Sequence, residues 1–243
     1  MAARYILFLI IVLISEILGT LGGFGSSVFM VPLSQYFFSF HMVLALTGLM
    51  HVFSNASKMF LFYKHIHWKT TLLIGIPGVL FVLLGAWLTT IIRFTWAEAV
   101  LGLLLIVISA GLWIKPNWKL PPTVTNTITG GSIAGFLAGF VGTGGPIRGL
   151  VLAGLNLEKS VFVGTSAAVD MGIDLSRSVI YLGNGYLEKE MYYLIPFLIV
   201  ASFVGSWIGK QLLDKISQEV FKKIILGLVF AIGVSLIIKF WLN

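Results

Sequence analysis

The sequence contains no cysteine and little charge. The absence of cysteine excludes disulfide bonds, thiolate metal sites and cysteine nucleophiles. Only 10% of the 243 residues are charged and 58% are hydrophobic, whereas soluble domains carry roughly 25% charged residues. A soluble fold of this length could not bury so much apolar surface, but lipid-facing helices can expose it. We therefore expect a polytopic, all-α integral membrane protein with one transmembrane domain over residues 1–243, and we attribute its net charge of +7 to cytoplasmic loops rather than to nucleic-acid binding.

Eight hydrophobic stretches approach or exceed the roughly 20 residues that a membrane-spanning helix needs. They cover about residues 5–37, 43–63, 70–92, 96–114, 125–155, 160–182, 190–211 and 219–241. The first and fifth are too long for one span, and each contains a glycine-rich cluster, at residues 22–27 and 142–146. Glycine and proline break helices, and broken backbone at membrane depth needs protein or a cavity beside it. We therefore expect one break in each long stretch.

The two glycine clusters lie 119 residues apart, and other residues recur at this offset. Thr47 aligns with Ser166, His51 with Asp170, Asn55 with Asp174, Ser57 with Ser176, Lys58 with Arg177 and Pro77 with Pro196. This self-similarity indicates an internal duplication, an arrangement in which transporters place their site between the repeats. We expect repeat 1 at about residues 1–115, repeat 2 at about residues 125–243, and the proline-containing residues 115–125 as their linker.

Two topologies fit the eight stretches. If every stretch crosses once, the halves run parallel, and the 13 basic residues outside segment interiors divide 7 to 6 between the two sides. If the broken stretches are re-entrant hairpins, each half has three crossings, the halves are inverted, and the division is 9 to 4. The nine are Lys64, Lys69, Lys115, Lys119, Lys159, Lys210, Lys215, Lys222 and Lys223, and the four are Arg4, Arg93, Lys189 and Lys239. Because basic residues concentrate in cytoplasmic loops, we favour inverted halves with both termini outside the cytoplasm.

A polar stripe runs along one hydrophobic stretch of each half. Spacings of four, four and three residues put its members on one helix face; they are Thr47, His51, Asn55 and Lys58 in one half and Ser166, Asp170, Asp174 and Arg177 in the other. With Arg148 added, the positive charges exceed the negative ones, which suits an anionic substrate. We predict that His51, Asn55, Lys58, Arg148 and Arg177 bind this anion and that Asp170 and Asp174 carry protons. The alternative is that Lys58 and Arg177 only pair with Asp170 and Asp174 to hold the halves together.

The glycine breaks are a second reason to expect an anion. A half-helix that begins after each break turns its free N–H groups and positive dipole end toward the break, and glycine allows a ligand to approach the backbone. The breaks add Gly23, Gly25, Ser26, Ser27, Thr143, Gly144 and Gly145 to the predicted binding residues. Alternatively, the breaks are packing kinks. Neither run has the context of a nucleotide-binding loop, so we predict no cofactor and no metal. Glu16 is a weaker proton-carrier candidate, because its equivalent in the second half is Gly135.

Two glycine-rich runs resemble the paired signature of the TauE/SafE family of sulfite exporters and toluenesulfonate uptake permeases. They are Gly22-Gly23-Phe24-Gly25-Ser26-Ser27, followed by Val31-Pro32-Leu33, and Gly139-Phe140-Val141-Gly142-Thr143-Gly144-Gly145-Pro146. Val163-Gly164-Thr165-Ser166 resembles a second family element and adds Thr165 and Ser166 to the predicted binding residues. In the first run, Ser26-Ser27 stands where the family has two glycines.

The resemblance implies secondary transport of a small sulfur-containing or carboxylated anion across a bacterial or archaeal inner membrane. Sulfite, sulfonates and sulfoacetate-like molecules are the expected substrates, carried by alternating access and with protons as the expected coupling ion. A passive anion channel of the same fold is the alternative. A minor alternative is an intramembrane enzyme in which Ser26 or Ser27 acts with His51.

Overall fold

The computed structural model is helical throughout the part of the chain that it describes, which is all but residues 1, 24, 92–95, 116–119, 156, 214, 216 and 243. The basic residues Arg93 and Lys119 lie outside this part, and the side chains of Arg4, Lys222, Lys223 and Lys239 are not described either. The α-helices are α1 (Ala2–Gly22), α2 (Ser27–Ser34), α3 (Phe40–Leu61), α4 (Trp68–Leu88), α5 (Ala97–Ile114), α6 (Val124–Phe140), α7 (Gly145–Gly154), α8 (Lys159–Gly183), α9 (Ile195–Leu213) and α10 (Gln218–Leu242). Two short 3-10 helices, η1 (Tyr63–His65) and η3 (Lys189–Leu194), precede α4 and α9.

The two long hydrophobic stretches break where their glycine clusters predicted. Helix α1 ends at Gly22 before α2 begins at Ser27, and α6 ends at Phe140 before α7 begins at Gly145. Gly25 and Gly142 both have a φ of 84°, a left-handed conformation that residues with a Cβ rarely adopt. The glycines therefore permit the chain reversal that makes α1–α2 and α6–α7 helical hairpins. Five of the remaining six stretches each form one long helix, and the stretch 190–211 is made of η3 followed by α9.

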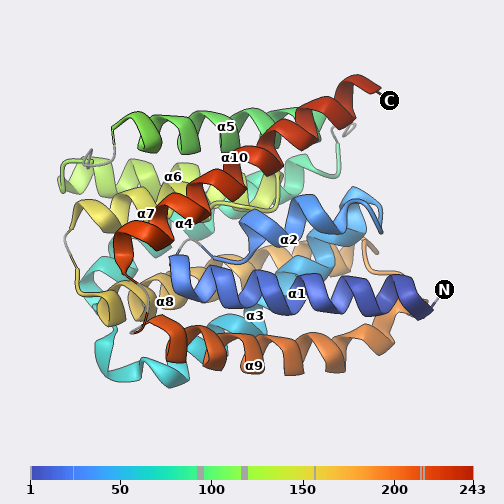
Figure 1. Ribbon diagram of the computed structural model, residues 1–243, viewed down its shortest axis with the longest axis horizontal. Coiled ribbons are helices and arrows are strands. Elements are labelled where there is room, and N and C mark those ends of the chain that lie inside the picture. Colours follow the sequence, from blue (N-terminus) through green and yellow to red (C-terminus); the bar gives the residue numbers. More distant parts are fainter. Residues whose placement is uncertain are drawn as a thin grey trace.

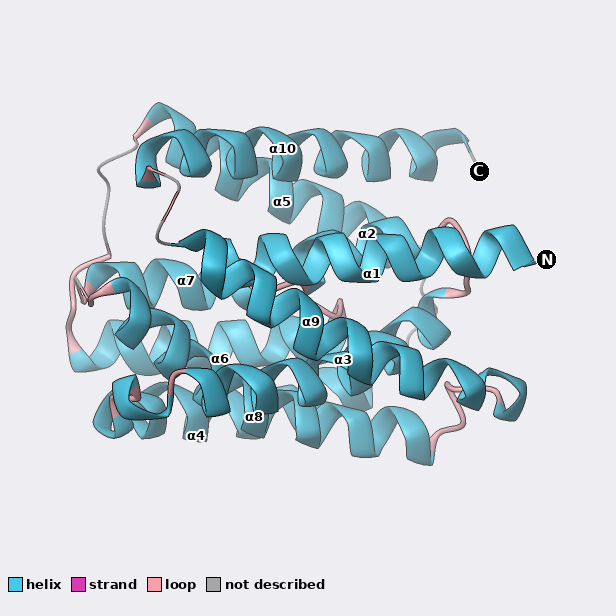
Figure 2. Cartoon of the chain, turned by 60° about the horizontal axis from the view of Figure 1, so that its bottom comes forward, coloured by secondary structure: helices cyan, strands magenta, loops and turns pink. Residues whose placement is uncertain are grey.

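Helices α3 and α8, which carry the polar stripes, pack against each other in the interior of the bundle. Helix α4 covers α8 and also packs against α6, while α9 covers α3 and also packs against α1. Helices α5 and α10 form a separate pair along one side (Figure 1), and a second view shows α4 and α8 on the side opposite that pair (Figure 2). The polar residues thus lie between helices whose outer faces are apolar, with Leu80, Trp87, Leu103 and Val107 among the exposed side chains.

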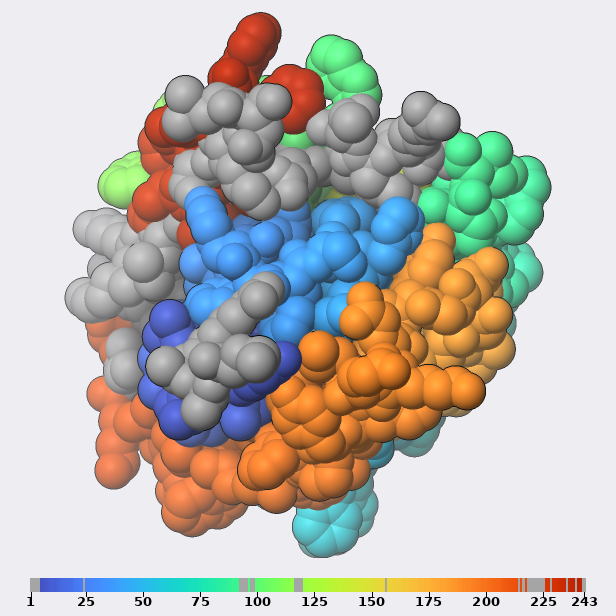
Figure 3. All heavy atoms as spheres, turned by 90° about the vertical axis from the view of Figure 1, so that its right-hand side faces the viewer, coloured from blue at the N-terminus to red at the C-terminus, as the bar shows by residue number. Residues whose placement is uncertain are grey.

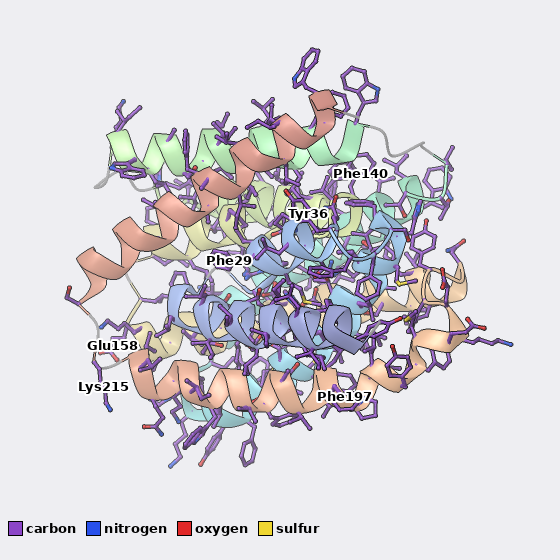
Figure 4. The ribbon with its side chains drawn as sticks, turned by 45° about the vertical axis from the view of Figure 1, so that its right-hand side comes forward. Phe29, Tyr36, Phe140, Glu158, Phe197 and Lys215 are labelled. Carbon is purple, nitrogen blue, oxygen red and sulfur yellow. The ribbon has the colours of Figure 1, made fainter. Side chains whose placement is uncertain are left out.

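The ends of the helices fall into two groups at opposite ends of the bundle. Helix α1 begins and α10 ends at the right-hand end of Figure 1, while α3 ends and α4 begins at the left-hand end. Glu158, just before α8, and Lys215, just after α9, lie together at one end in Figure 4. Figure 3 looks at the opposite end, where residues around the turn from α2 to α3 lie directly against η3 and the start of α9.

Three helical segments of the described chain are long and apolar enough to cross a membrane. They are Tyr5–Gly22, Trp68–Leu88 and Lys189–Leu213. Only the second and third belong to the six predicted crossings, because Tyr5–Gly22 lies in a stretch that we expected to be a re-entrant hairpin. Helices α3 and α8 fall short because their polar stripes lower their hydropathy, and α5 and α10 contain shorter apolar segments, Ala99–Ile114 and Val229–Ile238. The three segments and the apolar outer surface agree with an integral membrane protein.

Candidate functional site

The two polar stripes meet at Asp174 of α8. Asn55 of α3 donates to Asp174 Oδ2 at 2.7 Å, and His51 Nδ1 lies 3.4 Å from the same oxygen. Arg177, one helical turn away, donates from Nε to Asp174 Oδ1 at 2.7 Å. All four side chains are buried, so an ionised Asp174 has its charge compensated by donors from both helices. The two stripes therefore contact each other across α3 and α8.

Arg177 also closes the end of α6. Its Nη1 donates to the carbonyl oxygens of Ala138 at 3.2 Å and Gly142 at 3.0 Å. The last carbonyls of a helix have no partner within the helix, and a buried helix end needs donors from elsewhere. Arg177 supplies them at the second break. Its contacts are therefore largely structural, although it also borders one of the cavities described below.

The guanidinium group of Arg148, on α7, makes contacts through Nη1 and Nε but not through Nη2 within the described chain. It forms an ion pair through Nη1 with Asp170 and donates from Nε to Ser166 Oγ at 3.0 Å. Its Nη2 is buried and has no hydrogen-bond partner within the described chain. A Cβ added to Gly25 would lie 3.6 Å from this Nη2, so the backbone of the first break faces it. A buried donor without a partner costs roughly 1–3 kcal/mol, and a ligand that accepts from Nη2 would remove that cost.

Lys58 pairs with Glu16 of α1, and not with Asp170 or Asp174. The Lys58 Nζ atom lies 2.7 Å from Glu16 Oε1 and donates to Ser54 Oγ at 2.8 Å. The two aspartates are already engaged by arginines of their own half, so the proposed cross-pairing with Lys58 is wrong. Glu16 is fully buried, and its Oε1 also accepts hydrogen bonds from Thr20, Ser54 and Ser206.

Glu16 changes the charge balance of the site. The buried acids are Glu16, Asp170 and Asp174, and the buried bases are Lys58, Arg148 and Arg177. These charges cancel when His51 is neutral. The positive surplus expected from the sequence therefore exists only if a proton is added to the cluster. The sequence argument missed this because it discounted Glu16 for lack of a counterpart, although a carboxylate within an apolar stretch is itself a signal of function.

Ser26, at the start of α2, joins Glu16 to His51. Its hydroxyl donates to Glu16 Oε2 at 2.8 Å and lies 2.9 Å from His51 Nε2. Serine, histidine and aspartate follow one another here as in a hydrolase triad. The Ser26 hydroxyl, however, lies against a carboxylate, which would oppose formation of the alkoxide that attacks a substrate. This geometry gives no support to the enzyme alternative.

The two breaks meet in space. Ser27 Oγ of the first donates to Thr143 Oγ1 of the second at 3.0 Å, which confirms that they converge. Two small cavities lie beside Arg148, and Ser27 borders the second of them. Arg148 and Asp170 border both, so their ion pair stands between the two spaces.

Most of the predicted binding residues border a cavity. The first cavity is lined by Gly23, Gly25, Asn55, Lys58, Arg148, Ser166 and Asp170, together with Gly19, Thr20, Val163 and Ala167. The second is lined by Ser27, His51, Gly144, Gly145, Arg148, Asp170, Asp174 and Arg177, together with Ala138 and Gly142. Ser26, Thr143 and Thr165 border neither. Thr165 accepts a hydrogen bond from the backbone N–H of His67 at 3.0 Å, which ties α8 to the start of α4.

Comparison with known protein families gives one match. The family described as "Sulfite exporter TauE/SafE" matches residues 7–236, nearly the whole chain. No curated protein and no solved structure matched. The match includes both glycine breaks, both polar stripes and Glu16. With its helical bundle, apolar outer surface and buried charged site, the chain belongs to the TauE/SafE family of membrane transporters.

Proposed function

We propose that this protein is a secondary transporter of a small sulfur-containing or carboxylated anion, such as sulfite, a sulfonate or a sulfoacetate-like molecule, across a bacterial or archaeal inner membrane. The observation that carries the proposal is the Nη2 of Arg148, which is buried beside both breaks and has no hydrogen-bond partner among the residues that the structure describes. Guanidinium N–H groups match the oxygens of an oxyanion. Lys58 and Asn55 border the same cavity and supply further donors.

The pattern of helix packing supports an internal duplication with inverted halves. Helix α1 packs on α9 as α6 packs on α4, and α3 packs on α9 as α8 packs on α4. When each helix is replaced by its counterpart in the other half, the pair α1–α9 becomes α6–α4 and the pair α3–α9 becomes α8–α4. Corresponding helices also point in opposite directions, since α5 begins at the right-hand end of Figure 1 and its counterpart α10 ends there. We place repeat 1 at about residues 1–115 and repeat 2 at about residues 125–243.

The end of the bundle that holds most of the basic loop residues is placed in the cytoplasm. Lys64 lies between α3 and α4, Lys69 lies in the first turn of α4, and Lys215 follows α9 at the same end. Lys189 lies at the end where α8 leads into α9. This distribution follows the positive-inside rule for both termini outside the cytoplasm. The first cavity lies toward the cytoplasmic end, because Gly19, Lys58 and Val163 are near the ends of their helices there.

The balanced charges of the site favour coupling to protons. A monoanion that entered six cancelling buried charges would leave one negative charge uncompensated in a medium where that is costly. One proton bound with each negative charge of the substrate removes this cost. Asp170 and Asp174 were the carriers predicted from the sequence, and Glu16 joins them as a buried carboxylate next to a substrate-facing cation.

A passive channel is the second candidate, and the cavities argue against it. A channel needs a continuous path whose sites bind weakly enough for ions to leave. Arg148 and Asp170 are in contact and border both cavities, so an ion that passed from one cavity to the other would meet this pair. Alternating access, in which the halves rock around a central site, requires such an interruption.

Purified protein in lipid vesicles tests the proposal. We expect labelled sulfite to enter faster than into empty vesicles, and a pH gradient to drive it above its equilibrium level. A channel would let sulfite equilibrate but never accumulate against its electrochemical gradient. Vesicles that take up neither sulfite, a sulfonate nor sulfoacetate beyond the empty control would contradict transport of this substrate class.

A further inference from the structure

A continuous chain of polar atoms connects the two halves of the protein through Ser26. It runs from Glu16 Oε2 to Ser26 Oγ over 2.8 Å, on to His51 Nε2 over 2.9 Å, and from His51 Nδ1 to Asp174 Oδ2 over 3.4 Å. These four residues come from α1, the start of α2, α3 and α8. All are buried, with Ser26 and Glu16 fully so. The contacts among these four residues, rather than bulk water, therefore decide which atoms carry the protons.

The number of hydrogens in this chain follows from the chemistry of its members. A serine hydroxyl has one proton, and ionised carboxylates only accept. If Ser26 donates to an ionised Glu16, its oxygen can only accept from His51 Nε2–H. His51 Nδ1 lies 3.4 Å from Asp174 Oδ2, and the two form an ion pair when Nδ1 also carries a proton. Both ring nitrogens then carry protons, so His51 is an imidazolium with one proton more than the neutral ring.

A neutral His51 beside two ionised carboxylates does not fit the same geometry. A bare Nδ1 would turn its lone pair toward an Asp174 oxygen. A bare Nε2 would either face a lone pair of Ser26 or accept the Ser26 proton, and in the second case a lone pair of Ser26 would face the ionised Glu16. Moving the extra proton resolves this in one other way. The Nε2 proton passes to Ser26 Oγ while the Ser26 proton passes to Glu16 Oε2. Glu16 is then a neutral acid that donates to Ser26, Ser26 donates to neutral Nε2, and Nδ1–H still donates to Asp174.

We propose that Glu16, Ser26 and His51 form a proton relay in which the arrival of the proton at Glu16 frees Lys58 to hold the transported anion. The relay rests on the proposed function and assigns its coupling proton to residues other than Asp170. Lys58 Nζ is bound to Glu16 Oε1 and Ser54 and also borders the first cavity. When Glu16 is neutral, the ammonium loses its only anionic partner within the described chain. It then attracts an anion beside Arg148 Nη2.

The charges around the relay set its stoichiometry. Glu16 faces Lys58 and His51 of α3, while the groups that α2 and α9 turn toward it are the neutral hydroxyls of Ser26 and Ser206. Beyond His51 lie Asp174 with its partner Arg177, and then Asp170 with its partner Arg148. The three acids and three bases cancel, so the relay proton leaves the site with one positive charge in either position. One monovalent anion neutralises it, and one proton therefore accompanies each negative charge.

The test compares two serines that donate to the same carboxylate. Ser26→Ala removes the hydroxyl that bridges Glu16 to His51, whereas Ser206→Ala removes one that donates to Glu16 Oε1 at 2.8 Å and has no contact with His51. Vesicles report exchange of labelled sulfite without a pH gradient, uptake with a pH gradient, and internal pH from a trapped dye. In Ser26→Ala we expect the ratio of uptake with the gradient to exchange without it to fall by about tenfold. Ser206→Ala should keep the stimulation.

Glu16→Gln provides a second, independent measurement. The amide keeps a carbonyl oxygen for the surrounding hydroxyls but imitates the protonated acid permanently. We expect this variant to exchange sulfite without moving protons, and its affinity for sulfite to lose the pH dependence of the wild type. Glu16→Gln tests the proton relay even if the Ser26→Ala variant does not fold.

Several outcomes would overturn the relay. It is wrong if Ser26→Ala and Glu16→Gln both move one proton with each sulfite charge as the wild type does. It is also wrong if the wild type accumulates sulfite with a sodium gradient and not with a pH gradient, although anion transport itself would then stand. Wild-type vesicles that carry no anion of the proposed class would overturn transport and relay together.

Discussion

Arg148 and Arg177 are both buried arginines paired with an aspartate of α8, yet their remaining nitrogens differ. Arg177 Nη1 donates hydrogen bonds to the carbonyl oxygens at the end of α6. Arg148 Nη2 has no hydrogen-bond partner in the described part of the chain, and Arg148 borders both cavities. The first arrangement stabilises a helix end, and the second is available to a ligand. The sequence placed both residues in one predicted anion site because residue type and spacing do not reveal which hydrogen bonds are already made.

Removing the Arg148–Asp170 pair as a unit should separate binding from folding. Arg148→Gln alone leaves Asp170 as an uncompensated buried charge and should lower the free energy of unfolding by about 3–5 kcal/mol. The double variant Arg148→Gln with Asp170→Asn removes both charges and should recover most of that stability. It should still bind sulfite at least about tenfold more weakly, because a charge-assisted hydrogen bond is lost. Thermal unfolding with and without sulfite measures both effects, and normal affinity in the double variant would place the anion elsewhere.

Arg177→Lys tests the structural role of the second arginine. Lysine keeps the charge beside Asp174 but cannot reach that carboxylate and the two carbonyl oxygens with a planar fork. We expect the melting temperature in detergent to fall, while the affinity for sulfite of the protein that remains folded changes little. The matched substitution Arg148→Lys should show the opposite pattern, a loss of affinity that exceeds the loss of stability. Equal losses of affinity in both variants would mean that Arg177 also binds the anion.

The helix pairs α4–α6 and α1–α9 occupy comparable positions but are packed differently. A Cβ on Gly135 of α6 would lie 2.1 Å from the carbonyl oxygen of Gly78, so these backbones touch. In α1–α9, Gly205 instead faces the side chain of Glu16. The α4–α6 interface thus has no room for a carboxylate at the position of Gly135. This explains why Glu16 has no counterpart, and why an argument from symmetry alone undervalued it.

Gly135→Ala should separate α4 from α6. The added methyl group must displace backbone, and overpacking of this kind costs about 1–3 kcal/mol. Gly111→Ala in α5 is the matched control, since a Cβ there would meet nothing within 4 Å, and alanine favours helix over glycine. Melting temperatures in detergent should fall for the first variant and stay level or rise for the second. A Gly135→Ala protein as stable as wild type would mean that α4 and α6 are not in backbone contact.

The helix breaks were predictable from sequence because glycine and proline act on the backbone locally, and Gly25 and Gly142 do have the positive φ that requires glycine. The facing stripes of α3 and α8 were predictable from their spacing. The partner of Lys58 was not, because it depends on how α1 packs beside α3. Nor did spacing reveal that Thr165 turns away from the site toward His67.

At the scale of the whole molecule, the topology is open to direct labelling because the chain has no cysteine of its own. Glu190→Cys lies in η3, and Lys215→Cys lies at the opposite end after α9. We expect an impermeant thiol reagent to label Glu190→Cys in intact cells and Lys215→Cys only after lysis. The reverse pattern would mean that the orientation is inverted, and labelling of both in intact cells would contradict the placement of the two loops on opposite sides.

The central claim is that an anion binds between the two halves, at Arg148 Nη2 and Lys58. The most direct measurement is a crystal structure with selenite, whose selenium can be located by anomalous scattering as a substitute for the sulfur of sulfite. The claim predicts a peak within about 4 Å of Arg148 Nη2, given N–H···O distances near 2.8 Å, beside the glycine breaks. A peak confined to the loop lysines Lys64, Lys69 and Lys215, with none between the halves, would contradict it.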